Sequence, residues 1–310
     1  MAQRWLLELN GIKINIINRT KATPIKTIER LIPNIRAACE AFTLSFNVGT
    51  MTKTFSVTLV DAALKNKATA SGNVGYFMLK EFLRGTYNVY INTDFIGINE
   101  VRTTLFHELA HLWHAFIGET MKRSVPFVTK LNIAIARQRA VLRAASSSKS
   151  VSASLSNLRM YLADFLWTIY IEGIAKYAEE LMVGSRQQST VFYGSALRIA
   201  ERIEEKLVSV PKQFKRGNIA EFRKDMRVYL SKLEPFTYYI GTFITAFLVE
   251  HGYTIEELMK LSPYSFVKAY EAKASNPVIS VTSGRGVFDY GRALKYITEA
   301  AKYAASQKIV

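Results

Sequence analysis

LFHELAHLWH, residues 105–114, is the stretch on which the fold and the chemistry of this chain depend. Residues four apart on an α-helix lie on one face, so a helix here presents the imidazoles of His107 and His111 side by side. Glu108 lies about 100° further round the helix axis, from where its carboxylate reaches the same point without being a ligand. The interleaved leucines and Phe106 indicate that this helix packs into a core.

Two imidazoles at this spacing form the kind of nitrogen ligand pair that Zn²⁺ prefers. Zinc lowers the pKa of a bound water molecule to about 7, and a neighbouring carboxylate then takes the proton. The chain has four histidines, and three of them fall within this stretch, which favours a metal site over a chance motif. We therefore predict a Zn²⁺ site with ligands His107 and His111 and with Glu108 as general base.

A catalytic zinc site needs a third protein ligand and one open position. His114 lies on the same helical face, but three ligands along one straight helix do not close a tetrahedron. We interpret it as a core or supporting histidine, with ligation as the alternative. Glu172 is the better candidate, because an unpaired carboxylate in its apolar stretch, residues 165–175, would be costly. Its alternative is an ordinary pair with Lys176 on a solvated face.

In these residues, the sequence resembles the gluzincin, or thermolysin-like, zinc metallopeptidases over about residues 87–262. HELAH followed by EGIAKY, residues 172–177, is similar to their peptidase branch, in which a downstream glutamate completes the zinc site. The stretch YYIG, residues 238–241, is similar to the Tyr-x-x-Gly helix of many such proteins. The resemblance implies zinc ligands His107, His111 and Glu172, and Glu108 as general base.

The resemblance also implies that Tyr238, or else Tyr239, donates a hydrogen bond to the oxyanion of a tetrahedral intermediate. It places an edge strand at Tyr87–Ile91, where an extended peptide substrate could pair. The sequence departs from the family at Lys176, where thermolysin-like proteins have an aspartate that orients a ligand histidine. Asp164 and Glu179 are the two candidates for that task. Without an exopeptidase signature, the choice between endopeptidase and exopeptidase stays open.

The expected fold class is α+β, with a small mixed N-terminal lobe that carries an edge strand before the HExxH helix. Alternation predicts strands at residues 54–61, 74–82 and 87–91. Helical periodicity begins at Asn99, and Gly118 is the expected stop of the first such helix. We predict three segments: the N-terminal lobe (1–118), a basic helix with a serine-rich loop (119–157), and a helical lobe (158–310). The zinc cleft is expected between the lobes.

The chain has 310 residues, of which 49% are hydrophobic, so it is neither disordered nor fibrous. Its single cysteine, Cys39, excludes an internal disulfide framework and a cysteine-rich metal site. The N-terminus has no apolar signal core, and the longest apolar run, residues 236–249, is too short for a bilayer span. We predict a soluble, cytoplasmic protein without a transmembrane segment, and the oligomeric state is open.

The net charge is +16, and part of it lies in an acid-free tract between Glu119 and Asp164. This basic tract contains Lys122, Arg123, Lys130, Arg137, Arg139, Arg143, Lys149 and Arg159. It is either a solvated basic face or a docking surface for a polyanion.

The expected function is that of a zinc-dependent metallopeptidase that cleaves a peptide or protein substrate. The alternative is a non-catalytic zinc-stabilised binding protein, whose basic surface binds nucleic acid, a membrane or a virion partner.

Overall fold

The structure is a computed structural model that describes residues 3–46, 54–64, 74–82, 84–94, 96–97, 100–120, 151–182, 188–215 and 237–306. The chain divides into two compact units. The first contains Met1–Val128 and Ala175–Arg186, and the second contains Thr129–Ile174 and Gln187–Val310. Most of the basic tract lies outside the described residues, as do Asn99 and residues 121–150 of the segment expected to hold a basic helix and a serine-rich loop. The division into three segments stays a prediction.

The first unit contains a five-stranded mixed sheet in the order β1-β2-β3-β5-β4. Its strands are β1 (Arg4–Leu9), β2 (Ile12–Asn18), β3 (Phe55–Val60), β4 (Gly75–Phe77) and β5 (Asn88–Asn92). β2, β3 and β5 run parallel to one another, whereas β1 and β4 pair antiparallel with their neighbours. This sheet and the mainly helical region that follows confirm the predicted α+β class.

The β1–β2 hairpin is not among the predicted strands. Its two central residues, Asn10 and Gly11, have φ angles of 49° and 79°. Positive φ at both positions is what a two-residue hairpin turn of type I′ requires, and Asn-Gly is the preferred pair for it. The signal was therefore present in the sequence, between two runs of alternating apolar residues.

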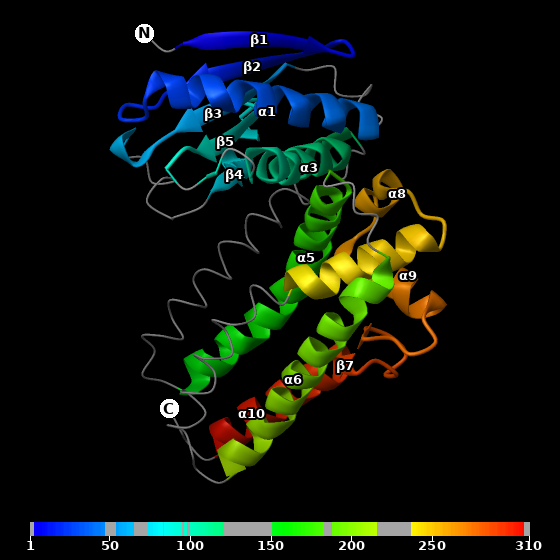
Figure 1. The fold of residues 1–310 in the computed structure, drawn as a ribbon. Helices are drawn as coiled ribbons and strands as arrows, with labels where there is room; N and C mark the ends of the chain where they lie inside the picture. Colours follow the sequence, from blue (N-terminus) through cyan, green and yellow to red (C-terminus); the bar gives the residue numbers. More distant parts are fainter. Residues whose placement is uncertain are drawn as a thin grey trace. The chain divides into compact units, whose positions relative to one another are not determined.

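Helices α1 (Ile25–Ser45) and α3 (Glu100–Thr120) cover one face of this sheet (Figure 1). The T-shaped contact of Phe42 with Phe106 joins the two helices, with ring centroids 5.8 Å apart. α1 continues through Pro33, and α3 continues through Gly118, so Gly118 does not end the helix as expected. α3 is buried nearly all round, which holds the HELAH motif within the core.

The outermost strand next to α3 is β4, and this corrects the expectation for Tyr87–Ile91. That segment corresponds to β5, which lies between β3 and β4 and has five buried residues. The predicted strand at residues 74–82 is shorter than expected, because the short helix α2 (Leu79–Phe82) follows β4. Strand order depends on pairing between distant segments, so local alternation could not identify the edge.

The second unit is mainly helical. Its helices are α5 (Val151–Met182), whose end belongs to the first unit, α6 (Ser189–Lys215), the helical residues 237–250, α8 (Ile255–Met259), α9 (Pro263–Lys273) and α10 (Tyr290–Ser306). The short parallel strands β6 (Ile279–Ser280) and β7 (Phe288–Asp289) precede α10. α6 and α10 lie side by side (Figure 1), and an Arg292–Glu204 ion pair of 2.6 Å joins them. α5 begins at Val151, so the end of the serine-rich stretch is helical and not a loop.

Two glycines allow a close helix crossing in the second unit. A Cβ on Gly173 of α5 would lie 2.3 Å from the backbone of Gly241 in the helical residues 237–250. A Cβ on Gly241 would lie 2.1 Å from the carbonyl oxygen of Ile169. Any side chain at either position would therefore force the helices apart. The turn of α5 that carries Glu172 is fixed by this contact.

Candidate metal centre

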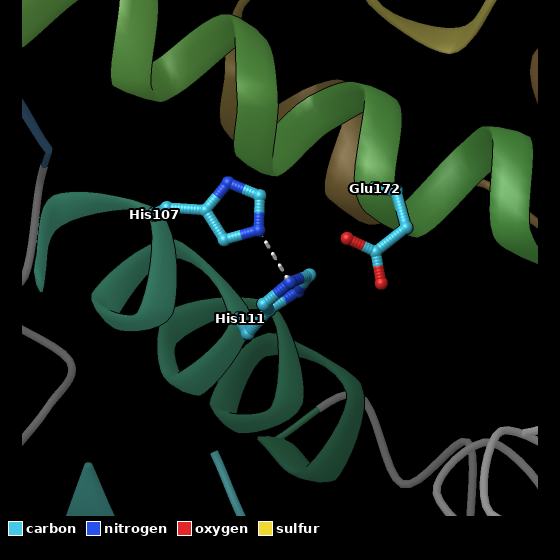
Figure 2. Close-up of side chains that lie close together, drawn as sticks. All are labelled: His107, His111 and Glu172. Atoms are coloured by element: carbon cyan, nitrogen blue, oxygen red, sulfur yellow. Dashed lines mark hydrogen bonds between the residues drawn. The ribbon is translucent and has the colours of Figure 1, made fainter. Parts of the chain in front are cut away.

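The structure brings three of the predicted site residues together (Figure 2). His107 and His111 project from successive turns of α3, and Glu172 projects from α5 toward them. Each offers one ligand atom, and these atoms all lie within 4.8 Å of one another. Glu172 lies on α5 just before Ala175, where this helix passes into the first unit. The three residues could hold a metal ion.

The spacing of the two imidazoles fits a bound cation. Nε2 of His107 lies 3.1 Å from Nε2 of His111. Two nitrogens bound to one tetrahedral zinc ion at 2.0–2.1 Å would be roughly 3.3 Å apart. Two unprotonated imidazole nitrogens facing each other at this distance repel, so the arrangement requires a proton or a cation between them. With a carboxylate close by, the donor set is the one that Zn²⁺ takes in hydrolytic sites.

The other ring nitrogen of His107 faces Glu179 on α5. Nδ1 of His107 lies 3.3 Å from Oε2 of Glu179, and Nζ of Lys176 lies 2.7 Å from Oε1 of the same carboxylate. Burial favours the neutral acid, but the contact with His107 and the hydrogen bond and charge of Lys176 outweigh it and lower the pKa of Glu179. Burial also disfavours the charge of Lys176, yet its pairs with Glu179 and Glu180 raise its pKa. The carboxylate is therefore ionised beside the imidazole.

Glu108 lies on α3 next to His107 and is 9% exposed. It faces strand β4, where a Cβ on Gly75 would lie 3.0 Å from Cγ and 3.4 Å from Oε1 of Glu108. The absence of a side chain at Gly75 therefore makes room for the carboxylate beside the outermost described strand. The assignment of Glu108 as general base stays a prediction.

The remaining candidates differ in how deeply they are buried. His114 is buried, at 3% exposure, and is not one of the three residues of the metal group. Tyr238 is half-buried and Tyr239 is 48% exposed, both on the helical residues 237–250. The role of Tyr238 in binding an oxyanion stays a prediction. Cys39 is fully buried, and its burial, followed by the charge of Glu40, raises the pKa of the thiol to about 12.

Glu179 lies beside His107, a candidate ligand, whereas the side chain of Asp164 lies outside the described residues. Glu179 was one of two candidates in the sequence, and the spacing along the chain did not show which of them contacts a histidine. It follows Glu172 by two helical turns, so both carboxylates lie on similar faces of α5. In thermolysin-like proteins the aspartate that orients a ligand histidine comes only one turn after the glutamate, and here that position is Lys176.

Within the described ranges, no helix combines the length and the apolarity that a bilayer crossing requires. The chain matches no protein-family profile, no curated protein and no solved structure. The evidence for a function is therefore the geometry of the site itself.

Proposed function

We propose that this protein is a zinc-dependent metallopeptidase in which His107, His111 and Glu172 bind the metal. The observation that carries the proposal is the convergence of these three side chains on one point, with their ligand atoms within 4.8 Å. Two helical histidines and a glutamate form a set of three protein ligands, which is the number that a catalytic zinc site uses. When bound there, zinc supplies Lewis acidity that activates water and polarises a carbonyl group.

The chain itself supplies the proton transfer. Glu108 takes a proton from the water molecule that attacks the substrate carbonyl, and passes it to the nitrogen of the leaving amine. Both transfers use the same carboxylate, so the enzyme returns to its starting protonation state after one turnover. Because Glu108 is largely buried, few water molecules compete for its oxygens.

Strand β4 is suited to hold the substrate. Of the two edge strands in the described part of the sheet, β1 and β4, it is β4 that lies against Glu108, through Gly75. An extended peptide that pairs with such an edge is aligned by main-chain hydrogen bonds, whatever its side chains are. We therefore expect β4, and not Tyr87–Ile91, to align the substrate.

The test is a comparison of metal content with peptide cleavage. The purified protein should carry about one zinc ion per chain, and His107→Ala or His111→Ala should lose it. Glu108→Gln should keep the zinc and lose chelator-sensitive cleavage of a peptide library. Full hydrolysis by Glu108→Gln would contradict the mechanism. Zinc without any cleavage by the unmodified protein would instead support a non-catalytic, zinc-stabilised binding protein.

A further inference from the structure

We propose that Glu179 is the positioning residue that orients His107 for metal binding, and that Lys176 fixes Glu179 for this task. The inference rests on the metal site proposed above and adds two residues to it. Both lie on the last turns of α5, in the same compact unit as His107. In the gluzincins, which the sequence resembles, an aspartate one turn after the glutamate ligand has this task. Here Lys176 stands at that position, and Glu179 follows it by three residues.

The two nitrogens of His107 face two different partners. Nε2 faces His111 at 3.1 Å, and Nδ1 faces Oε2 of Glu179 at 3.3 Å. A carboxylate accepts hydrogen bonds and cannot donate them when it is ionised, so it favours the tautomer with the proton on Nδ1. That tautomer leaves the lone pair on Nε2, the atom that faces His111 and the proposed metal position. Glu179 therefore selects both the ring orientation and the ligand atom.

The carboxylate of Glu179 is itself held at both oxygens. Oε2 faces His107, and Oε1 accepts a hydrogen bond of 2.7 Å from Nζ of Lys176. Lys176 and Glu179 are three residues apart on one helix, so the pair needs no distant element to form. The side chain of Lys176 is 34% exposed and that of Glu179 is 21% exposed, so the pair is partly shielded from water. Lysine at this position thus supports a longer acidic side chain that reaches the histidine from the next turn.

The alternative is that Glu179 and Lys176 form an ordinary helix-surface ion pair. Such a pair would contribute little to stability and nothing to the metal. The two hypotheses differ in one respect, which is the effect on metal affinity. Partners that orient a ligand histidine typically change metal affinity by 10- to 100-fold when they are removed.

The experiment measures the zinc dissociation constant by competition with a chromophoric chelator. For Glu179→Gln we expect affinity to fall by roughly 10- to 100-fold. Lys176→Met should weaken binding in the same direction by a smaller factor, and Lys176→Arg should retain the affinity because arginine also pairs with a carboxylate. The absorption bands of the Co²⁺-substituted protein should shift in Glu179→Gln, since the orientation of a ligand ring would change.

Glu180→Gln is the matched control. The side chain of Glu180 is 21% exposed, like that of Glu179, and its Oε1 lies 3.4 Å from Nζ of Lys176. This variant should bind zinc like the unmodified protein. Equal zinc affinity and unchanged Co²⁺ bands in Glu179→Gln would overturn the role of Glu179. If the unmodified protein binds no zinc, the proposed function fails, and this inference fails with it.

Discussion

At the scale of single residues, Gly75 of β4 lies close to the proposed general base, Glu108. A Cβ there would lie 2.7 Å from Cγ2 of Thr104 and 3.0 Å from Cγ of Glu108. Both atoms belong to α3, which is buried along most of its length and cannot move away freely. The residue therefore controls where the Glu108 carboxylate lies, although it has no side chain of its own.

We expect Gly75→Ala to keep zinc and to lower peptide hydrolysis by roughly 10- to 100-fold, because displacement of a catalytic group by about 1 Å has effects of this size. The added methyl should also destabilise the fold by about 1–3 kcal/mol. The measurement combines metal content, urea unfolding and a cleavage assay. Gly194→Ala is the control, since a Cβ on Gly194 meets nothing within 4 Å. Unimpaired cleavage by Gly75→Ala would contradict the positional role.

At the scale of elements, the crossing of α5 with the helical residues 237–250 fixes the turn that carries Glu172. The crossing depends on Gly173 and Gly241, whose backbones are too close for any side chain. Tyr170 strengthens the packing on the same helix, because its hydroxyl lies 2.7–3.1 Å from the carbonyl oxygens of Leu258, Met259 and Leu261.

We expect Gly241→Ala to destabilise the protein by about 3 kcal/mol or more, since its Cβ would overlap the carbonyl of Ile169 and neither helix backbone can yield cheaply. Thermal or urea unfolding measures the change. Gly194→Ala again serves as control and should be neutral or slightly stabilising, because alanine is the better helix former. A Gly241→Ala protein as stable as the unmodified chain would show that the helices do not meet at this point.

The helical part of the candidate site could be predicted from the sequence, because its geometry is local. The i, i+4 spacing of His107 and His111 brings their imidazoles together in any α-helix. Glu172 could be predicted because a carboxylate in an apolar stretch needs a partner. The partner of His107 could not be predicted, since the choice between Asp164 and Glu179 depends on where α5 passes α3. The prediction that Tyr87–Ile91 is an edge strand was wrong for the same reason: strand order depends on pairing between distant segments.

At the scale of the whole molecule, each compact unit contains a buried carboxylate that holds a loop by its backbone N–H groups. In the first unit, Oδ2 of Asp61 accepts hydrogen bonds from the N–H groups of residues 21–23. In the second unit, Glu271 of α9 accepts hydrogen bonds from those of residues 281–283. Burial favours the neutral acids, but hydrogen bonds outweigh it and lower both pKa values. For Glu271, the side chain of Ser283 and then these N–H groups lower the pKa to about 2.

A lowered pKa in the folded state predicts a loss of stability in acid. The contribution of Glu271 is fully present above its unfolded pKa, near 4.5, and is lost as the pH falls toward its folded pKa of about 2. Glu271→Gln should therefore be less stable than the unmodified protein at pH 7, and the difference should shrink as the pH falls through this window. Urea unfolding at several pH values measures this.

Glu299→Gln, at an exposed position of α10, is the control for this prediction. It should change the free energy of unfolding by less than about 0.5 kcal/mol at any pH. A Glu271→Gln protein with an undiminished deficit at pH 3 would contradict the assignment of the acid sensitivity to Glu271.

The division of the chain also has a consequence for the order in which the protein is completed during its synthesis. A chain leaves the ribosome from its N-terminus, so the sheet and α3 emerge first, with both histidines. Residues 175–186, which belong to the same unit, follow only after residues 129–174, which belong to the other. The first unit is therefore incomplete until the last turns of α5 have been synthesised. A single proteolytic cut between residues 129 and 171 would leave the histidines on one fragment and their carboxylate partners on the other.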